Sequence, residues 1–181
     1  MKNNLILKLI SLLIFFVKIS NSYSEELRFE ASSIEIIDKD KIIIAKEGVK
    51  ILSGDKIVID ANQMRYNKGE KFLEASGNIK IINQIDNIEI TSDDITYDKN
   101  AEKIVSSGNV EIKFEDNYLL KTKEIIYLKN SGEILINHRS KIKDNLGNEI
   151  EFEQLNFNSI DKLIKGKTVK LLDFEQNFYN F

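Results

Sequence analysis

The chain repeats one pattern about every 30 residues, and this repeat limits the possible folds more than any other feature of the sequence. Successive units begin at intervals of 30, 31, 30 and 30 residues, at Ile34, Met64, Ile95, Ile125 and Leu155. An aromatic residue lies two positions after each of the last four starts, at Tyr66, Tyr97, Tyr127 and Phe157. A fixed period of this length is typical of architectures in which each unit packs against its neighbours.

Each unit contains about three short runs in which apolar and polar residues alternate, as in "NVEIKF" (109–114) and "NIEIT" (87–91). Alternation with a period of two predicts half-buried strands. The runs are bounded by turn-forming clusters such as "NKGE" (67–70) and "KNSGE" (129–133). The sequence therefore predicts an all-β, antiparallel domain of roughly 12 to 16 strands built from stacked repeats.

A glycine recurs near the middle of the first three units, at Gly48, Gly77 and Gly108. His138 takes the position of Gly108 in the fourth unit, and Gly166 lies close to it in the fifth. We interpret the three glycines as turn or bulge residues, where the chain reverses and needs a positive φ or a close backbone approach. No phosphate-binding loop pattern accompanies them.

The first residues have the pattern of a secretory signal peptide. Lys2 and Lys8 precede the short apolar run "LISLLIFF" (9–16), and Ser22 and Ser24 occupy the −3 and −1 positions of a cleavage site. The apolar run is shorter than the roughly 20 residues that cross a bilayer comfortably. We expect a signal peptide at 1–24 and one folded domain at 25–181, with a retained N-terminal anchor as the alternative.

Composition and charge exclude several classes of protein. The chain has no cysteine, so it has no disulfide scaffold, thiol nucleophile or cysteine-bound zinc. Removing residues 1–24, which hold three lysines and no acid, changes the formal net charge from −3 to −6. A chain of this sign is a poor nucleic-acid binder, so we expect no nucleic-acid partner.

No motif indicates catalysis, a cofactor or a metal site, and we interpret the protein as a non-enzyme. His138 is the one histidine and is expected to be a turn residue, while Asp93 and Asp94 are expected to be solvated. The basic segment "HRSKIK" (138–143) either meets lipid phosphates or forms a solvated strand face.

Residues 28–172 resemble the OstA-like domain family. The resemblance lies in the order of "FEASSIEI" (29–36), "IAKEGVKIL" (44–52), "DKIVIDA" (55–61) and "YNKGEKFLEASGNIKI" (66–81). The family includes the periplasmic lipopolysaccharide-transport protein LptA and the periplasmic N-terminal domain of the outer-membrane translocon LptD. The resemblance implies a twisted β-jellyroll, or β-taco, whose two sheets face each other around an open apolar groove.

The resemblance further implies a periplasmic bridge component in outer-membrane biogenesis of a Gram-negative cell. Its groove would shelter lipopolysaccharide acyl chains, and it would join LptC-like and LptD-like jellyrolls, or copies of itself, by edge-strand pairing. The C-terminal segment "LLDFEQNFYNF" (171–181) is expected to be a strand that joins a partner or ends the groove. A retained signal would instead suggest an LptC-like membrane-tethered protein.

The candidate lining of the groove is the set of apolar residues on one face of the expected strands. This set is Ile36, Val49, Ile51, Ile57, Ile59, Met64, Tyr66, Ile79, Ile81, Ile88, Ile90, Ile95, Tyr97, Val110, Ile112, Ile125, Tyr127, Ile134, Ile136 and Phe152. The same residues could form a plain sandwich core. Two alternatives therefore stay open: a stand-alone or truncated LptD-type N-terminal domain, and a structural β-repeat protein without lipid cargo.

Overall fold

The computed structural model describes residues 27–39, 41–53, 57–83, 88–114, 118–158, 160–161, 163–173 and 177–180. The expected signal peptide lies outside these residues, as does the side chain of Ile57. The described part of the chain contains fifteen strands. They are β1 (Leu27–Glu30), β2 (Ser33–Ile37), β3 (Ile42–Ser53), β4 (Ile57–Asn67), β5 (Phe72–Asn83), β6 (Ile88–Asp98), β7 (Lys103–Phe114), β8 (Tyr118–Leu128), β9 (Glu133–Ile136), β10 (Ser140–Asp144), β11 (Glu149–Phe152), β12 (Gln154–Asn158), β13 (Leu163–Lys167), β14 (Lys170–Leu172) and β15 (Phe178–Asn180).

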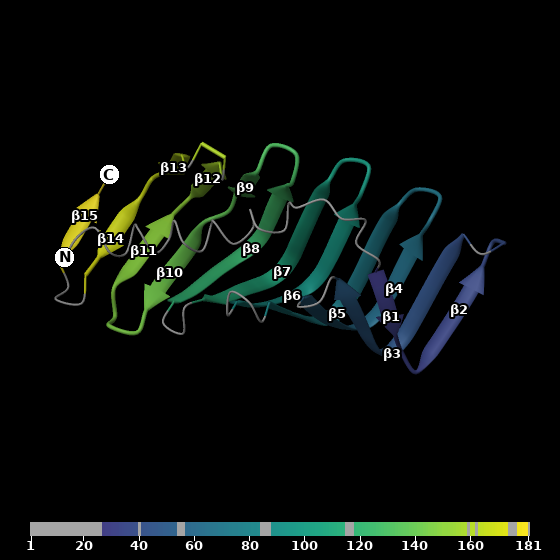
Figure 1. The fold of residues 1–181 in the computed structure, drawn as a ribbon. Coiled ribbons are helices and arrows are strands. Elements are labelled where there is room, and N and C mark those ends of the chain that lie inside the picture. The colour runs from purple at the N-terminus through teal and green to yellow at the C-terminus, as the bar shows by residue number, and fades with distance from the viewer. Residues whose placement is uncertain are drawn as a thin grey trace.

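All of these strands belong to one antiparallel sheet, and Figure 1 shows it as an elongated, twisted row from β2 to β15. The main path runs β1-β3-β4-β5-β6-β7-β8-β10-β11-β14-β15, while β2 pairs with β3 and the pair β12-β13 joins through β9 to β8. The prediction of an all-β antiparallel domain is confirmed. The architecture is consistent with a β-jellyroll.

The long strands β3 to β8 have an irregularity near their middle. The register between neighbours shifts at Lys46/Val49, Asp60/Gln63, Ser76/Ile79, Thr91/Asp94 and Ser107/Val110. An extra residue in one strand of an antiparallel pair bends that strand and increases its twist. The extra residue lies in β3, β5 and β7, so a bulge divides each of these strands into two halves, and β4, β6 and β8 lie opposite the bulges.

The three repeated glycines lie at these bulges, inside β3, β5 and β7. Gly48, Gly77 and Gly108 have φ values of 72°, 78° and 73°, the left-handed region that glycine adopts without a steric penalty. The structure confirms a bulge with a positive φ at each glycine. The expectation that the chain reverses there is wrong, because each strand continues beyond its glycine. The reversals lie instead at the ends of the long strands, which are 11 to 12 residues long.

Beyond β8 the two halves of the sheet continue as separate branches (Figure 1). Lys121 to Tyr118 of β8 pair with β10, whereas Ile126 to Leu128 pair with β9. We call the two sides wall A and wall B. Wall A comprises β1, β10, β11, β14, β15 and residues 49–53, 57–60, 79–83, 88–91, 110–114 and 118–122. Wall B comprises β2, β9, β12, β13 and residues 42–46, 63–67, 72–76, 94–98, 103–107 and 124–128.

Beyond β8, the chain crosses from one wall to the other at the repeat positions that form bulges in the earlier repeats. His138 lies in the crossing from β9 to β10 and is exposed, which agrees with its alignment to Gly108. Glu153 and Thr168 lie at the next two crossings, between β11 and β12 and between β13 and β14. Each 30-residue repeat thus contains one strand that runs from wall B to wall A and a second strand that returns from wall A to wall B.

Candidate functional site

The strand register joins the inward-facing side chains of each wall into one continuous apolar row. Residues directly opposite on antiparallel neighbours lie on the same face of the sheet. Row A, on wall A, consists of Phe29, Ile51, Ile59, Ile81, Ile90, Ile112, Leu120, Ile142, Ile150, Leu171 and Tyr179. Row B, on wall B, consists of Ile36, Ile43, Tyr66, Leu73, Tyr97, Ile104, Tyr127, Ile134, Phe157 and Ile164.

The inner faces of the two walls pack together. One buried cluster joins Ile112 and Ile142 of wall A to Phe157 of wall B, and a second joins Ile51 of wall A to Met64 of wall B. Every member of rows A and B is apolar or a tyrosine. The interior between the walls can therefore hold apolar groups by burial, and it offers no charged side chain from either row for proton transfer or metal binding.

The exposure of the inner-face residues varies along the sheet. In row B, Tyr66, Tyr97, Ile104 and Ile164 are half-buried. Between and beside them, Leu73, Tyr127 and Phe157 have 4%, 1% and 0% of their surface exposed. Three small residues, Ala45, Ala61 and Ala75, are buried in the cluster nearer the N-terminus.

The structure places every described candidate lining residue on the inner face of a wall. Ten belong to rows A and B, and the other described candidates, such as Val49 and Ile136, lie on the same faces nearer the bend or beside the rows. Ile36 is 54% exposed because β2 is an edge strand. Contact of any of these residues with lipid stays a prediction.

Several inner-face residues were missed by the sequence-based prediction. They include Leu73, Ile104, Tyr118, Leu120, Ile142, Ile150, Leu155, Phe157 and the three buried alanines. The alternation that marked Ile79 and Ile81 also runs through Leu73 and Ala75 of the same strand. Following that alternation through leucine and alanine, and not only through β-branched and aromatic residues, would have found them.

Buried hydroxyl groups lie along the bend between the walls. Ser106 Oγ donates a hydrogen bond to Ser92 Oγ at 2.9 Å. Ser140 Oγ lies 2.7 Å from Thr122 Oγ1 and 2.7 Å from the carbonyl oxygen of His138. Because buried polar groups are costly unless they are hydrogen-bonded, these pairs allow small polar side chains at the bend.

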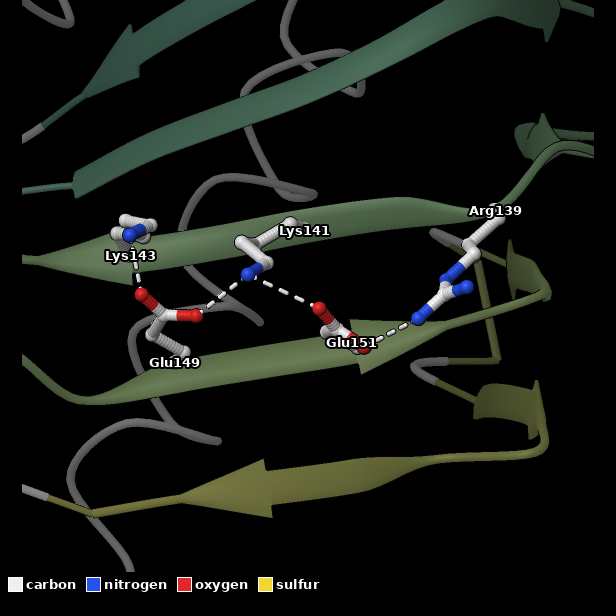
Figure 2. Close-up of polar contacts among 5 residues, drawn as sticks. All are labelled: Arg139, Lys141, Lys143, Glu149 and Glu151. Carbon is white, nitrogen blue, oxygen red and sulfur yellow. Dashed lines mark hydrogen bonds and ion pairs between the residues drawn. The ribbon is translucent and has the colours of Figure 1, made fainter. Parts of the chain in front are cut away.

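The outer face of wall A carries a ladder of cross-strand ion pairs, whose densest part is shown in Figure 2. Lys141 Nζ lies 2.6 Å from Glu149 Oε2 and 2.9 Å from Glu151 Oε1, and Arg139 Nη2 lies 2.9 Å from Glu151 Oε2. Lys143 also pairs with Glu149. Hydrogen bonds from Lys141 and then Arg139 lower the pKa of Glu151 to about 2. The basic segment 138–143 therefore forms a paired strand face.

A hollow of about 560 Å³ lies over the outer face of wall B. Its lining includes Gln63, Arg65, Glu74 and Ser76, which face away from the interior. Gln63 Nε2 donates to Ser76 Oγ at 2.8 Å, and Arg65 Nη1 lies 3.8 Å from Glu74 Oε2. These groups satisfy one another, so the hollow does not extend the apolar interior.

Nineteen chains of solved structures match this chain. No protein-family model matches the chain, and no curated protein matches it significantly. The chain is similar to LptH from Pseudomonas aeruginosa, described as the LptA-homologous periplasmic component of the lipopolysaccharide transport device. The identity is 18% and the TM-score is 0.33, over 78% of this chain and 81% of that chain. Within the described residues, no helix is long and apolar enough to cross a membrane.

Proposed function

We propose that the protein carries lipopolysaccharide acyl chains between walls A and B, as a periplasmic component of a bridge to the outer membrane. The observation that carries this proposal is the continuity of the two apolar rows, from Phe29 to Tyr179 on wall A and from Ile36 to Ile164 on wall B. Removal of apolar surface from water contributes about 25 cal/mol per Å². Burial of several acyl chains between the walls would therefore be enough to hold the lipid, and no covalent chemistry is needed.

The ends of the sheet support a role within a longer assembly. The edge strand β2 presents Ile34 and Ile36 on its inner face, and they are 49% and 54% exposed. An unpaired edge with apolar side chains is a site for strand addition. A neighbouring jellyroll, either LptC-like or LptD-like or a second copy, would cover these side chains and extend both apolar rows.

Site-specific photocrosslinking in the exporting cell tests the proposal. A photoreactive residue replaces Ile81 or Tyr97, which are half-buried members of rows A and B. The matched controls are Ile82 and Thr96, the adjacent residues of the same strands, whose side chains face outward. We expect lipopolysaccharide adducts at Ile81 and Tyr97 and none at either control.

A structural repeat protein without lipid cargo is the second candidate function. The observation that favours it is the complete burial of Tyr127 and Phe157, which resembles an ordinary sandwich core. In that case a folded, exported protein would give no adduct at any of the four positions, and the carrier proposal would be abandoned.

A further inference from the structure

A line of charged residues borders row B where wall B ends in turns. The register of β3 and β4 ends with the pair Ile42 and Asn67, and the next backbone hydrogen bond runs from Lys68 N to Lys41 O at 2.7 Å. The neighbouring turns are joined in the same way, from Lys99 N to Lys71 O at 3.1 Å. These four lysines occupy the register positions immediately beyond row B. We call them the lysine border.

The next pair along the same edge is Glu102 and Lys129, and it shows how side chains at this position behave. Lys129 N donates to Glu102 O at 2.8 Å, so the backbone arrangement is the same as in the lysine border. Lys129 Nζ lies 3.0 Å from Glu102 Oε2 and 5.6 Å from the ring centroid of Tyr97. A cation at this register position thus reaches over row B, where Glu102 pairs with it.

One repeat earlier, Lys71 occupies the position of Glu102. Both residues have a left-handed backbone, with φ values of 54° and 48°. Lys99, the equivalent of Lys129, therefore has a lysine for its neighbour where Lys129 has a carboxylate. This single difference replaces an internal ion pair with two adjacent positive charges.

The lysine border also differs from five lysines of wall A. Lys80, Lys113, Lys121, Lys141 and Lys143 all pair with carboxylates. None of the four border lysines forms an ion pair with a residue in the described part of the chain. Asp98 is nearby, but its Oδ1 accepts hydrogen bonds from Asn100 N and Ala101 N. Glu70 lies within the turn between Lys68 and Lys71 and is exposed.

We propose that the lysine border binds the phosphate of an anionic lipid headgroup, while the acyl chains of the same lipid lie along the adjacent half-exposed part of row B. The proposal rests on the proposed carrier function. It places the headgroup at the edge of wall B where the strands end in turns. Ile43, Tyr66 and Tyr97 supply the apolar surface beside the border. Unpaired ammonium groups next to apolar surface match a phosphate joined to a hydrocarbon chain.

Calorimetric binding of three probes tests the inference on the protein purified as the cell exports it. Dodecyl phosphate carries both chain and phosphate, dodecyl glucoside carries the chain with a neutral headgroup, and inorganic phosphate carries the anion alone. Lys71→Glu recreates the arrangement of Glu102 beside Lys129, and Glu102→Lys extends the unpaired lysines by one position. Lys123→Glu is the charge-matched control, because Lys123 is exposed on β8 at the bend.

We expect Lys71→Glu to weaken dodecyl phosphate binding by about tenfold at low salt and Glu102→Lys to strengthen it by about fivefold. Dodecyl glucoside binding should be unchanged in both variants, which also shows that they fold. Lys123→Glu should bind all probes as the unaltered protein does.

Other outcomes overturn the inference in distinguishable ways. If dodecyl phosphate and dodecyl glucoside bind equally in all variants, the border has no headgroup role but the carrier proposal stands. If inorganic phosphate binds as tightly as dodecyl phosphate, the site takes free phosphate and the lipid assignment is wrong. If neither alkyl probe binds, both the inference and the carrier proposal fail.

Discussion

The carboxylate of Asp93 lies directly over the backbone of Gly108, so that a Cβ at Gly108 would stand only 2.4 Å from Asp93 Oδ2. Asp93 Oδ2 is held there by a hydrogen bond from Asn109 Nδ2 at 2.9 Å. Gly48 occupies the equivalent bulge in β3 with nearly the same φ, but a Cβ there would meet nothing within 4 Å. Substitution of Gly48 therefore measures the cost of backbone strain alone, and substitution of Gly108 measures that cost together with the cost of a steric clash.

We predict that Gly48→Ala lowers the free energy of unfolding by about 1 to 2 kcal/mol, the cost of a left-handed alanine. Gly108→Ala should cost about 1 to 3 kcal/mol more, because Asp93 must also move. Urea unfolding measures both values. The Cβ of Asp93 would itself stand 2.7 Å from the added Cβ, so the control background is Asp93→Gly. In that background the extra cost at Gly108 should largely disappear, and its persistence there would contradict the assigned clash.

The bulges also show where the sequence was ambiguous. A glycine followed by asparagine with positive φ suits a turn as well as a bulge, so "SGN" at 107–109 alone does not decide between them. The decision comes from the partner strand, because Ser107 pairs with Glu124 and Val110 with Thr122 of the same neighbour. Continuous pairing on both sides of Gly108 is a tertiary property that local sequence does not contain.

Alternation, in contrast, identified the inner faces well. In β6 and β7 the residues Ile90 and Ile112 face inward because period two fixes the face of every residue once one is known. The same rule does not predict that the basic segment "HRSKIK" (138–143) forms ion pairs with carboxylates. These carboxylates, Glu149 and Glu151, come from the next strand, and only the β10–β11 register brings them opposite Lys143 and Lys141.

The ion-pair ladder of wall A predicts a pH dependence of stability. Because Lys141 and then Arg139 lower the pKa of Glu151 from 4.5 to about 2, its contribution to stability is complete above pH 4.5. That contribution is lost as the pH falls from 4.5 to about 2. We predict that Glu151→Gln lowers the free energy of unfolding by about 1 kcal/mol at pH 7 and has no effect near pH 2.

Urea unfolding at the two pH values measures this difference. Glu124→Gln is the control, since Glu124 forms no ion pair within the described residues, and it should be near neutral at both pH values. An effect of Glu151→Gln that is equal at pH 7 and pH 2 would show that the charge of Glu151 contributes no stability.

The two tyrosines Tyr66 and Tyr127 should differ in their contribution to stability, although both belong to row B. Tyr127 is 1% exposed within the larger cluster, so Tyr127→Ala should cost about 3 to 5 kcal/mol. Tyr66 is half-buried against Phe29, with ring centroids 6.0 Å apart, and Tyr66→Ala should cost about 1 to 2 kcal/mol. Chemical unfolding in the absence of lipid gives both values.

A loss at Tyr66 as large as that at Tyr127 would mean that the part of the interior between β3 and β7 is an ordinary closed core. The proposed lipid site would then have no room in the lipid-free protein. A small loss of stability in Tyr66→Ala would agree with an interior that is incompletely packed around Tyr66 until a ligand binds there.

The edge strand β2 predicts how the chain associates with a neighbour. Ile36 faces inward opposite Ile43, whereas Glu35 of the same strand faces outward opposite Ile44. If a second copy adds to this edge, Ile36 becomes buried and Glu35 stays in solvent. Ile36→Lys should therefore abolish end-to-end self-association, because an unpaired ammonium would enter the apolar junction, and Glu35→Lys should leave it intact. Sedimentation velocity over a range of protein concentrations measures both effects. Equal weakening by the two variants would place the contact on the outer face of β2, and association would then not extend the apolar rows from one copy to the next.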